Sequence, residues 1–229
     1  MYCLVNVTSG GACLSVDPRE ILTSPTMKAH VRRIRDLDAV LKDLEPHVKA
    51  PDFLRKGRPF GNFGLLPREL LANLLICLAG NFEDPKNRLT VCTDPLGGDG
   101  LVFNQNHGGY MSTEHVFVPA PRDGDLQIVE NKILAAVAHK NEKGSRYASG
   151  KDLVVFSEAK GIWHPNNAAR RLIGRHSFEN VWVVHLENLN GQEYSYCVVW
   201  LEVSRGNAAP AWRIRIANDF KAHSVERIQ

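Results

Sequence analysis

Apolar residues recur at three- and four-residue steps in three stretches of the chain, the spacing that places them on one helix face. The first stretch, residues 26–47, predicts an amphipathic helix that Pro46 ends. The second, residues 67–81, is apolar nearly all round, and we expect this helix to be buried. The third spans residues 126–141 and carries Lys140 at the next position on its apolar stripe.

Beyond residue 150 the pattern changes to short apolar runs that predict strands at residues 153–156, 181–184, 194–203 and 212–216. The first two runs lack polar alternation, as strands covered on both faces do. Between them, residues 165–172 are typical of a short helix with proline near its start. Helices separated by a small mixed sheet imply an α/β sandwich.

Residues 89–118 predict a β-hairpin with a turn-rich tip at residues 104–110. We expect Asp99 to enter one strand of this hairpin and Glu114 to enter the other. Neighbouring strands lie about 4.8 Å apart, so carboxylates at facing strand ends meet. Two carboxylates with nearby carbonyls form an oxygen-rich site that suits a hard cation such as Mg²⁺.

The chain divides into an N-terminal elaboration, residues 1–66, and a main unit, residues 67–229. The elaboration is expected to hold short strands, the first amphipathic helix and a basic loop that carries Lys56 and Arg58 among phenylalanines. Basic and aromatic residues together suit nucleic-acid contact. The alternative, a loop whose phenylalanines are buried in the core, is equally compatible with the pattern.

Composition sets broad limits on function. The net charge of +3 permits nucleic acid as a partner without arguing strongly for it. The five cysteines contain no C-x-x-C pair, which disfavours a disulfide framework or a zinc ribbon and favours a reducing compartment. No apolar run approaches the ~20 residues that span a bilayer, and the start lacks the features of a signal peptide. We therefore expect a cytoplasmic protein without a membrane partner.

The order of the elements over about residues 67–186, with Glu69, Asp99 and Glu114, resembles the PD-(D/E)XK nuclease superfamily, the restriction-endonuclease-like fold. That family pattern has a first helix with an optional glutamate, a strand that opens with aspartate, and a next strand with Asp/Glu-x-Lys. A second helix and a further strand follow. The resemblance implies a restriction-endonuclease-like α/β sandwich, with a small mixed sheet flanked by helices.

The resemblance also implies a chemistry, Mg²⁺- or Mn²⁺-dependent hydrolysis of a nucleic-acid phosphodiester, with DNA as the expected substrate. Asp99 and Glu114 would be the metal ligands and Glu69 an auxiliary ligand. The chain departs from the pattern at Val116, which occupies the position of the family lysine. Lys140, or less plausibly Lys132, would supply the missing positive charge from the second helix. As an alternative, Lys140 extends to solvent, as a lysine at the end of an apolar stripe usually does.

Other features widen the list of hypotheses. Arg170, Arg171 and Arg175 follow an aromatic, polar loop and are candidates for phosphate contacts. His115 is adjacent to Glu114, but the alternation of a strand points it to the opposite face. Val116 motivates a second hypothesis, a catalytically inactive module that binds nucleic acid or protein on the same scaffold. A third is an enzyme that acts on a small molecule. Many proteins of the resembled kind are dimers, which leaves a homodimer open.

Overall fold

The structure is a computed structural model that describes residues 36–57, 65–92, 99–106, 108–121, 128–159, 161–189, 193–202 and 208–229. The described helices are α3 (Leu37–Lys49), α4 (Pro51–Lys56), α5 (Pro67–Glu83), α6 (Val129–Asn141), α7 (Ser145–Ala148) and α8 (Pro165–Leu172). The described strands are β1 (Leu89–Cys92), β2 (Leu101–Asn104), β3 (Tyr110–Val118), β4 (Lys151–Ser157), β5 (Val181–Leu189), β6 (Glu193–Trp200), β7 (Ala211–Ala217) and β8 (His223–Arg227).

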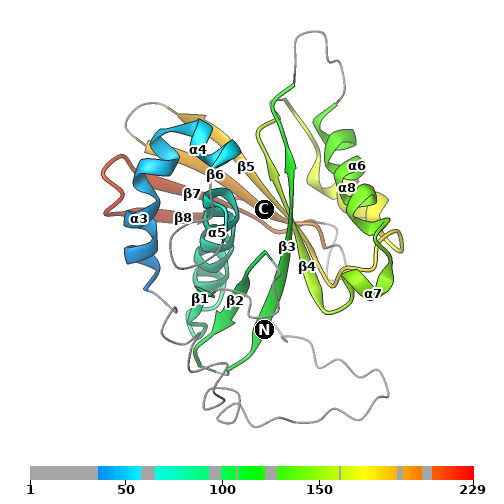
Figure 1. Ribbon diagram of the computed structural model, residues 1–229, viewed down its shortest axis with the longest axis horizontal. Helices are drawn as coiled ribbons and strands as arrows, with labels where there is room; N and C mark the ends of the chain where they lie inside the picture. Colours follow the sequence, from blue (N-terminus) through cyan, green and yellow to red (C-terminus); the bar gives the residue numbers. More distant parts are fainter. Residues whose placement is uncertain are drawn as a thin grey trace.

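All eight described strands form one sheet, and their order in the sheet is their order in the chain. The pairs β3–β4 and β4–β5 are parallel, whereas all other neighbours are antiparallel. The two parallel connections carry α6 with α7, and α8, because a parallel return needs a crossover longer than a tight turn. The sheet curls into an open half-barrel around α5 (Figure 1).

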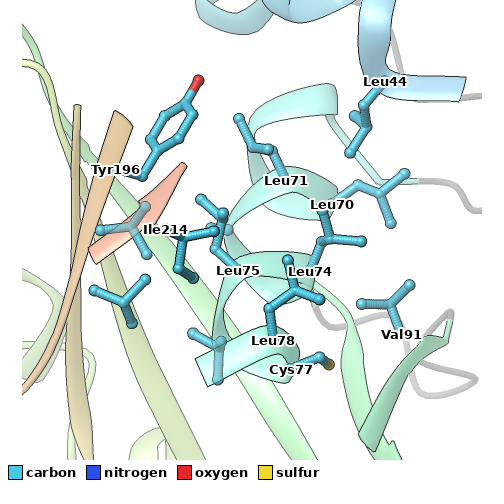
Figure 2. Close-up of a cluster of buried hydrophobic side chains, with 14 of the residues drawn as sticks. Leu44, Leu70, Leu71, Leu74, Leu75, Cys77, Leu78, Val91, Tyr196 and Ile214 are labelled. Atoms are coloured by element: carbon cyan, nitrogen blue, oxygen red, sulfur yellow. The ribbon is translucent and has the colours of Figure 1, made fainter. Parts of the chain in front are cut away.

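Two apolar cores lie on the two faces of this sheet. The core on the inner face surrounds α5, which contacts β1 near one edge of the sheet and β8 at the other (Figure 1). Figure 2 shows the leucines of α5 directed toward Tyr196 and Ile214 on one side and Leu44 and Val91 on the other. The core on the outer face lies between the parallel strands and the helices α6 and α8. Helix α3 adds its apolar face to the inner core.

The expected small mixed sheet flanked by helices, the restriction-endonuclease-like α/β sandwich, is wrong because the sheet has eight strands and curls. Strand β8 escaped prediction since four of its five residues are exposed, which leaves almost no apolar pattern to read. Strand β7 alternates partly exposed arginines with buried apolar residues, and β8 pairs with it, so β7 is internal to the sheet. Most of the remaining sheet lies where the apolar runs predicted strands.

The helix predictions agree with the structure in their cores and differ at their ends. Helix α8 spans the predicted residues, and α5 continues to Glu83. Pro46 lies inside α3 instead of ending it, because the last turn buries Val48 in the inner core. Helix α4 lies where a loop was expected. Residues 1–35, with the predicted N-terminal strands and the start of the first helix, lie outside the described residues.

No helix in the described part of the chain is long and apolar enough to span a membrane. The longest, α5, is apolar on nearly every side because the half-barrel and α3 surround it. Twelve of its seventeen residues are buried, including Leu70, Leu74 and Leu75. Removing apolar atoms at its centre therefore leaves a cavity that the curled sheet cannot easily close.

We predict that Leu75→Ala lowers the free energy of unfolding by about 2–5 kcal/mol, because Leu75 is fully buried between α5 and the sheet. Urea denaturation at equilibrium measures this change. Ile162→Ala is the matched control: this side chain is 86% exposed, so its truncation is expected to change stability by less than ~0.5 kcal/mol. Equal effects of the two substitutions would contradict the packing described for α5.

A carboxylate, Asp152, is buried on the inner face at the second position of β4. Its two oxygens accept hydrogen bonds from Asn180 Nδ2 at 2.9 Å and Trp182 Nε1 at 2.7 Å. Burial raises the pKa of Asp152 from 3.8 to about 6, although these two hydrogen bonds act in the opposite direction. Folding therefore favours the protonated form, and this contribution to stability is present at low pH and lost as the pH rises through 6.

We predict that Asp152→Asn gains about 2–3 kcal/mol in unfolding free energy, relative to wild type, between pH 4 and pH 6.5. The wild type loses stability over this window because its buried carboxyl must ionise, whereas asparagine stays neutral. Urea denaturation of both proteins at several pH values measures the difference. Parallel profiles for the two proteins would show that Asp152 does not titrate differently in the folded and unfolded states.

Candidate functional site

Asp99 lies two residues before the first residue of β2, and a contact to the backbone turns its side chain toward β3. Its Oδ2 accepts a hydrogen bond from the backbone N–H of His115 at 2.8 Å. Gly100, which follows, has φ of 131°, and a Cβ there would lie 2.6 Å from Asn73 Nδ2. Glycine is therefore needed at this position for both its backbone conformation and the close approach of α5. The conformation of Gly100 before β2 and the hydrogen bond from His115 of β3 together fix the position of the Asp99 carboxylate.

Glu114 is the fifth residue of β3, so the expectation that it enters the strand is wrong. It faces the outer side of the sheet, where it pairs in register with the buried Leu153 of β4. Its Oε1 accepts a hydrogen bond from Lys151 Nζ at 2.7 Å, and its Oε2 accepts one from the hydroxyl of Tyr147. The Glu114 side chain is only 8% exposed, so this carboxylate lies at the base of the site.

Lys140 joins the two carboxylates. Its Nζ lies 3.5 Å from Glu114 Oε2 and 4.0 Å from Asp99 Oδ2. Of the two alternatives for this lysine, the structure shows the one in which it reaches the carboxylates. The reason is the β3–α6–β4 crossover: Ile133 and Val137 bury the inner stripe of α6 on the outer face, which directs the next residue of that stripe toward Glu114.

Glu69 lies in the first turn of α5, and its Oε2 accepts a hydrogen bond from the backbone N–H of Leu66 at 2.9 Å. This contact caps the helix, which is a structural role for the side chain. Burial raises the pKa of Glu69, and the negative charge of Asp99 raises it further while Lys140 lowers it. Glu69 is therefore close enough to Asp99 and Lys140 to belong to the same electrostatic environment.

The two central carboxylates respond differently to their surroundings. Burial raises the pKa of Asp99, and the nearby charge of Glu114 adds to this effect, against the backbone hydrogen bond from His115. Burial also acts to raise the pKa of Glu114, but hydrogen bonds from Lys151 and Tyr147 bring it below its ordinary value. The donors around Glu114 thus stabilise its ionised form, whereas the surroundings of Asp99 disfavour its ionised form, which a bound cation would stabilise.

Sequence reasoning missed Tyr147 and Lys151, which the structure brings to Glu114. Strand β4 was expected to begin at residue 153 but begins two residues earlier, so the predicted strand did not include Lys151. In the parallel pairing, Lys151 lies opposite Ser112, one step of the two-residue alternation from Glu114. The sequence feature that could have identified Lys151 as a site residue was its position two residues before the buried apolar run. Tyr147 had no such signal, because α7 is a single turn.

His115 and Val116 lie as the strand alternation predicted. His115 faces α5 and is buried there, with its Nε2 at 3.1 Å from Asn73 Oδ1. Asn73 also donates to Thr113 Oγ1 at 3.1 Å, and Thr113 in turn donates to the carbonyl of Gly100 at 3.1 Å. This buried network connects α5 to the two strands that carry Asp99 and Glu114. Val116 packs into the apolar core of the outer face.

The predicted phosphate contacts are distributed over several places. Arg171 donates to Glu130 and Asn131 of α6 and is occupied there. Arg170 donates to Asn167 on its own helix. The carbonyl of Arg175 accepts from Asn141 Nδ2 at 3.4 Å, which places Arg175 beside the end of α6 that carries Lys140.

On the other side of the sheet, Lys56 is exposed at the end of α4. Its neighbour Arg55 pairs with Glu158 at 2.7 Å, directly after β4. Helix α4 therefore lies near the C-terminal ends of β3 and β4, whereas Lys151 lies at the opposite end of β4. Arg58 lies outside the described residues.

The donor set fits a hard cation in its chemistry, because Asp99, Glu114 and Glu69 offer carboxylate oxygens and the sulfur and imidazole ligands of a zinc site are absent from this cluster. Within the described residues, no group of three or more His, Cys, Asp or Glu side chains is placed to hold a metal ion. Two carboxylates with backbone oxygens and water are enough for Mg²⁺, which keeps several waters in protein sites. Asp99 and Glu114 are the residues that would hold it.

We predict that Asn73→Leu destabilises the fold by about 1–3 kcal/mol, because the buried side chains of Thr113 and His115 then lose hydrogen-bond partners. Equilibrium urea denaturation measures the change. Asn167→Leu, on the exposed side of α8, is the control and is expected to stay within ~0.5 kcal/mol of wild type. A neutral effect of Asn73→Leu would show that the network does not stabilise this junction.

No protein-family model matches the chain, and no curated protein is significantly similar to it.

Proposed function

We propose that the protein is a metal-dependent phosphodiesterase that acts on nucleic acid, with DNA as its substrate, as a divergent member of the PD-(D/E)XK superfamily. One observation carries the proposal: Lys140 Nζ lies within 3.5 Å of Glu114 and 4.0 Å of Asp99. Asp99 lies just before β2, Glu114 lies in the middle of β3 and Lys140 lies on the following helix. The two carboxylates match the resemblance to that superfamily, and Lys140 stands in for its strand lysine. The proposal concerns this site and not the size of the sheet.

Asp99 and Glu114 would hold Mg²⁺ or Mn²⁺, and Glu69 would support them as an auxiliary acidic group. A metal ion bound there would polarise the scissile phosphate and lower the pKa of a bound water. Lys140 takes the role that Val116 cannot perform: its ammonium orients the attacking water by hydrogen bonding and stabilises negative charge on the phosphate in the transition state. The half-buried position of Lys140, 15% exposed, strengthens this electrostatic effect.

Two further features support the proposal. Arg175, whose backbone carbonyl contacts Asn141 at the end of α6, is the arginine that we propose for a neighbouring phosphate of the same strand. The described cysteines Cys77 and Cys197 are free thiols, as in a protein that works in a reducing compartment, and we infer a cytoplasmic location. A homodimer, which would offer two such sites to the two strands of a duplex, is part of the same proposal.

We predict that Lys140→Met lowers the rate of DNA cleavage about 10²-fold or more, because one positioned cation is removed from the transition state. Asp99→Asn and Glu114→Gln are expected to abolish cleavage. The assay measures cleavage of duplex DNA and of single-stranded DNA and RNA, with Mg²⁺ and with Mn²⁺. Lys132→Met is the matched control, since it removes the same charge from the same helix. Cleavage that is unchanged in Asp99→Asn or Glu114→Gln would refute the proposal.

The second candidate function is a nucleic-acid-binding module without catalysis. The observation that favours it is the saturation of Glu114, whose two oxygens already accept from Lys151, Tyr147 and Lys140. Binding of DNA that weakens steeply with salt, is indifferent to Mg²⁺ and is never followed by cleavage would select this candidate.

A further inference from the structure

Three lysines surround the ring of Tyr147, and we name Lys140, Lys143, Lys151 and Tyr147 together the tyrosine–lysine cluster. The Nζ atoms of Lys143 and Lys151 each lie 4.5 Å from the ring centroid, and that of Lys140 lies 6.0 Å from it. The cluster is assembled where α6 ends, α7 forms one turn and β4 begins. It therefore lies at one end of the parallel strands, directly against Glu114.

The cluster holds more positive charge than its carboxylate contacts neutralise. Lys151 and Lys140 hydrogen-bond Glu114, and Lys140 also lies near Asp99. Lys143 donates to the neutral hydroxyl of Tyr147 at 3.2 Å and, in the part of the chain that the structure describes, to no carboxylate. Ammonium groups held this close repel one another. A phosphate that accepts hydrogen bonds from two of them would offset this repulsion.

Lys151 is the donor that Glu114 can most easily release. Lys151 is the first residue of β4, and its side chain is 27% exposed. Its flexible methylene chain allows the ammonium group to turn toward solvent. Tyr147, by contrast, is fixed by an edge-on contact between its ring and that of Phe178. Glu114 Oε1 accepts from Lys151 alone among the described donors, whereas Oε2 accepts from Tyr147 and Lys140. A metal ion bound through Oε1 would therefore compete with the ammonium of Lys151 for that oxygen.

We propose that Lys143, Lys151 and Tyr147 form a binding site for the backbone phosphate next to the scissile one, and that Glu114 withholds Lys151 from this site until a metal ion occupies the carboxylate. This inference rests on the proposed function, because the phosphate belongs to the bound nucleic acid. A cation held by Glu114 would therefore bind before the substrate, and the ammonium of Lys151 would then be free to contact this phosphate.

The first experiment measures the affinity of the protein for a short DNA duplex in EDTA over a series of salt concentrations. Lys143→Met is expected to reduce the slope of log K against log salt by about 1, since one phosphate contact is lost. Lys151→Met alone is expected to change the slope little, because Glu114 already holds that ammonium. Lys221→Met, in the turn between β7 and β8, removes an equal charge from an exposed position and is expected to leave the slope unchanged.

The second experiment tests the release of Lys151 by a double-mutant cycle, again without metal. Glu114→Gln is expected to bind the duplex about tenfold more tightly than wild type, because the freed lysine makes a charge-assisted contact. Asp99→Asn removes the same charge without touching Lys151 and is expected to gain much less. In Glu114→Gln/Lys151→Met the gain is expected to disappear. Circular dichroism and thermal unfolding verify that each variant is folded.

The outcomes separate this inference from the proposed function. A duplex that is bound and cleaved, but whose salt dependence is unchanged by Lys143→Met, overturns the phosphate site alone. A gain in Glu114→Gln that persists in the Lys151→Met background overturns the withholding of Lys151. If no variant and no wild-type protein binds the duplex, both the inference and the proposed function are refuted.

Discussion

The structure depends on the need to bury α5 on nearly every side. A helix that is apolar on every face is not buried by packing on a flat sheet, because about half of its apolar surface would remain in contact with water. The sheet therefore curls until β1 and β8 both contact the helix, and α3 covers part of what remains. Each additional strand contributes apolar area at about 25 cal/mol per Å², which is what favours eight strands over the smaller sheet that the sequence suggested.

The same helix also determines where the acidic groups lie. Only two of its buried residues are polar, Glu69 and Asn73. Glu69 accepts from the backbone at the start of the helix, whereas Asn73 contacts the middle of β3. Asn73 is joined to His115 and Thr113, and these residues flank Glu114 in the chain. The carboxylate on the outer face is thus held in place by hydrogen bonds on the inner face, because successive residues of one strand face opposite sides.

Much of the order of helices and strands could be predicted from the sequence, and the rest could not for physical reasons. Helix α8 and the buried strands β4 and β5 have strong apolar patterns, whereas β8 is largely exposed and has none. Curvature is a property of the whole sheet, and no local pattern encodes it.

For the candidate site, the helix stripe left two alternatives open for Lys140, and the crossover decides for the one in which it reaches Glu114. Lys151 was missed because the first two residues of β4 do not extend the apolar run. Tyr147 is brought to Glu114 by the single turn α7, and a single turn has no period from which the position of its side chains could be read. Glu69, Glu114 and Lys140, which the sequence revealed, lie on long regular elements.

The strand order has a consequence for how the molecule forms. Every strand pairs with its immediate neighbour in the chain, so each hairpin or crossover can close over a short separation and the sheet can grow from β1 toward β8. The central helix, however, precedes all of these strands, and its last covering surface comes from the last of them. In a chain still emerging from the ribosome, α5 therefore keeps part of its apolar surface exposed until β7 and β8 are added. Aggregation competes most directly with folding in this interval.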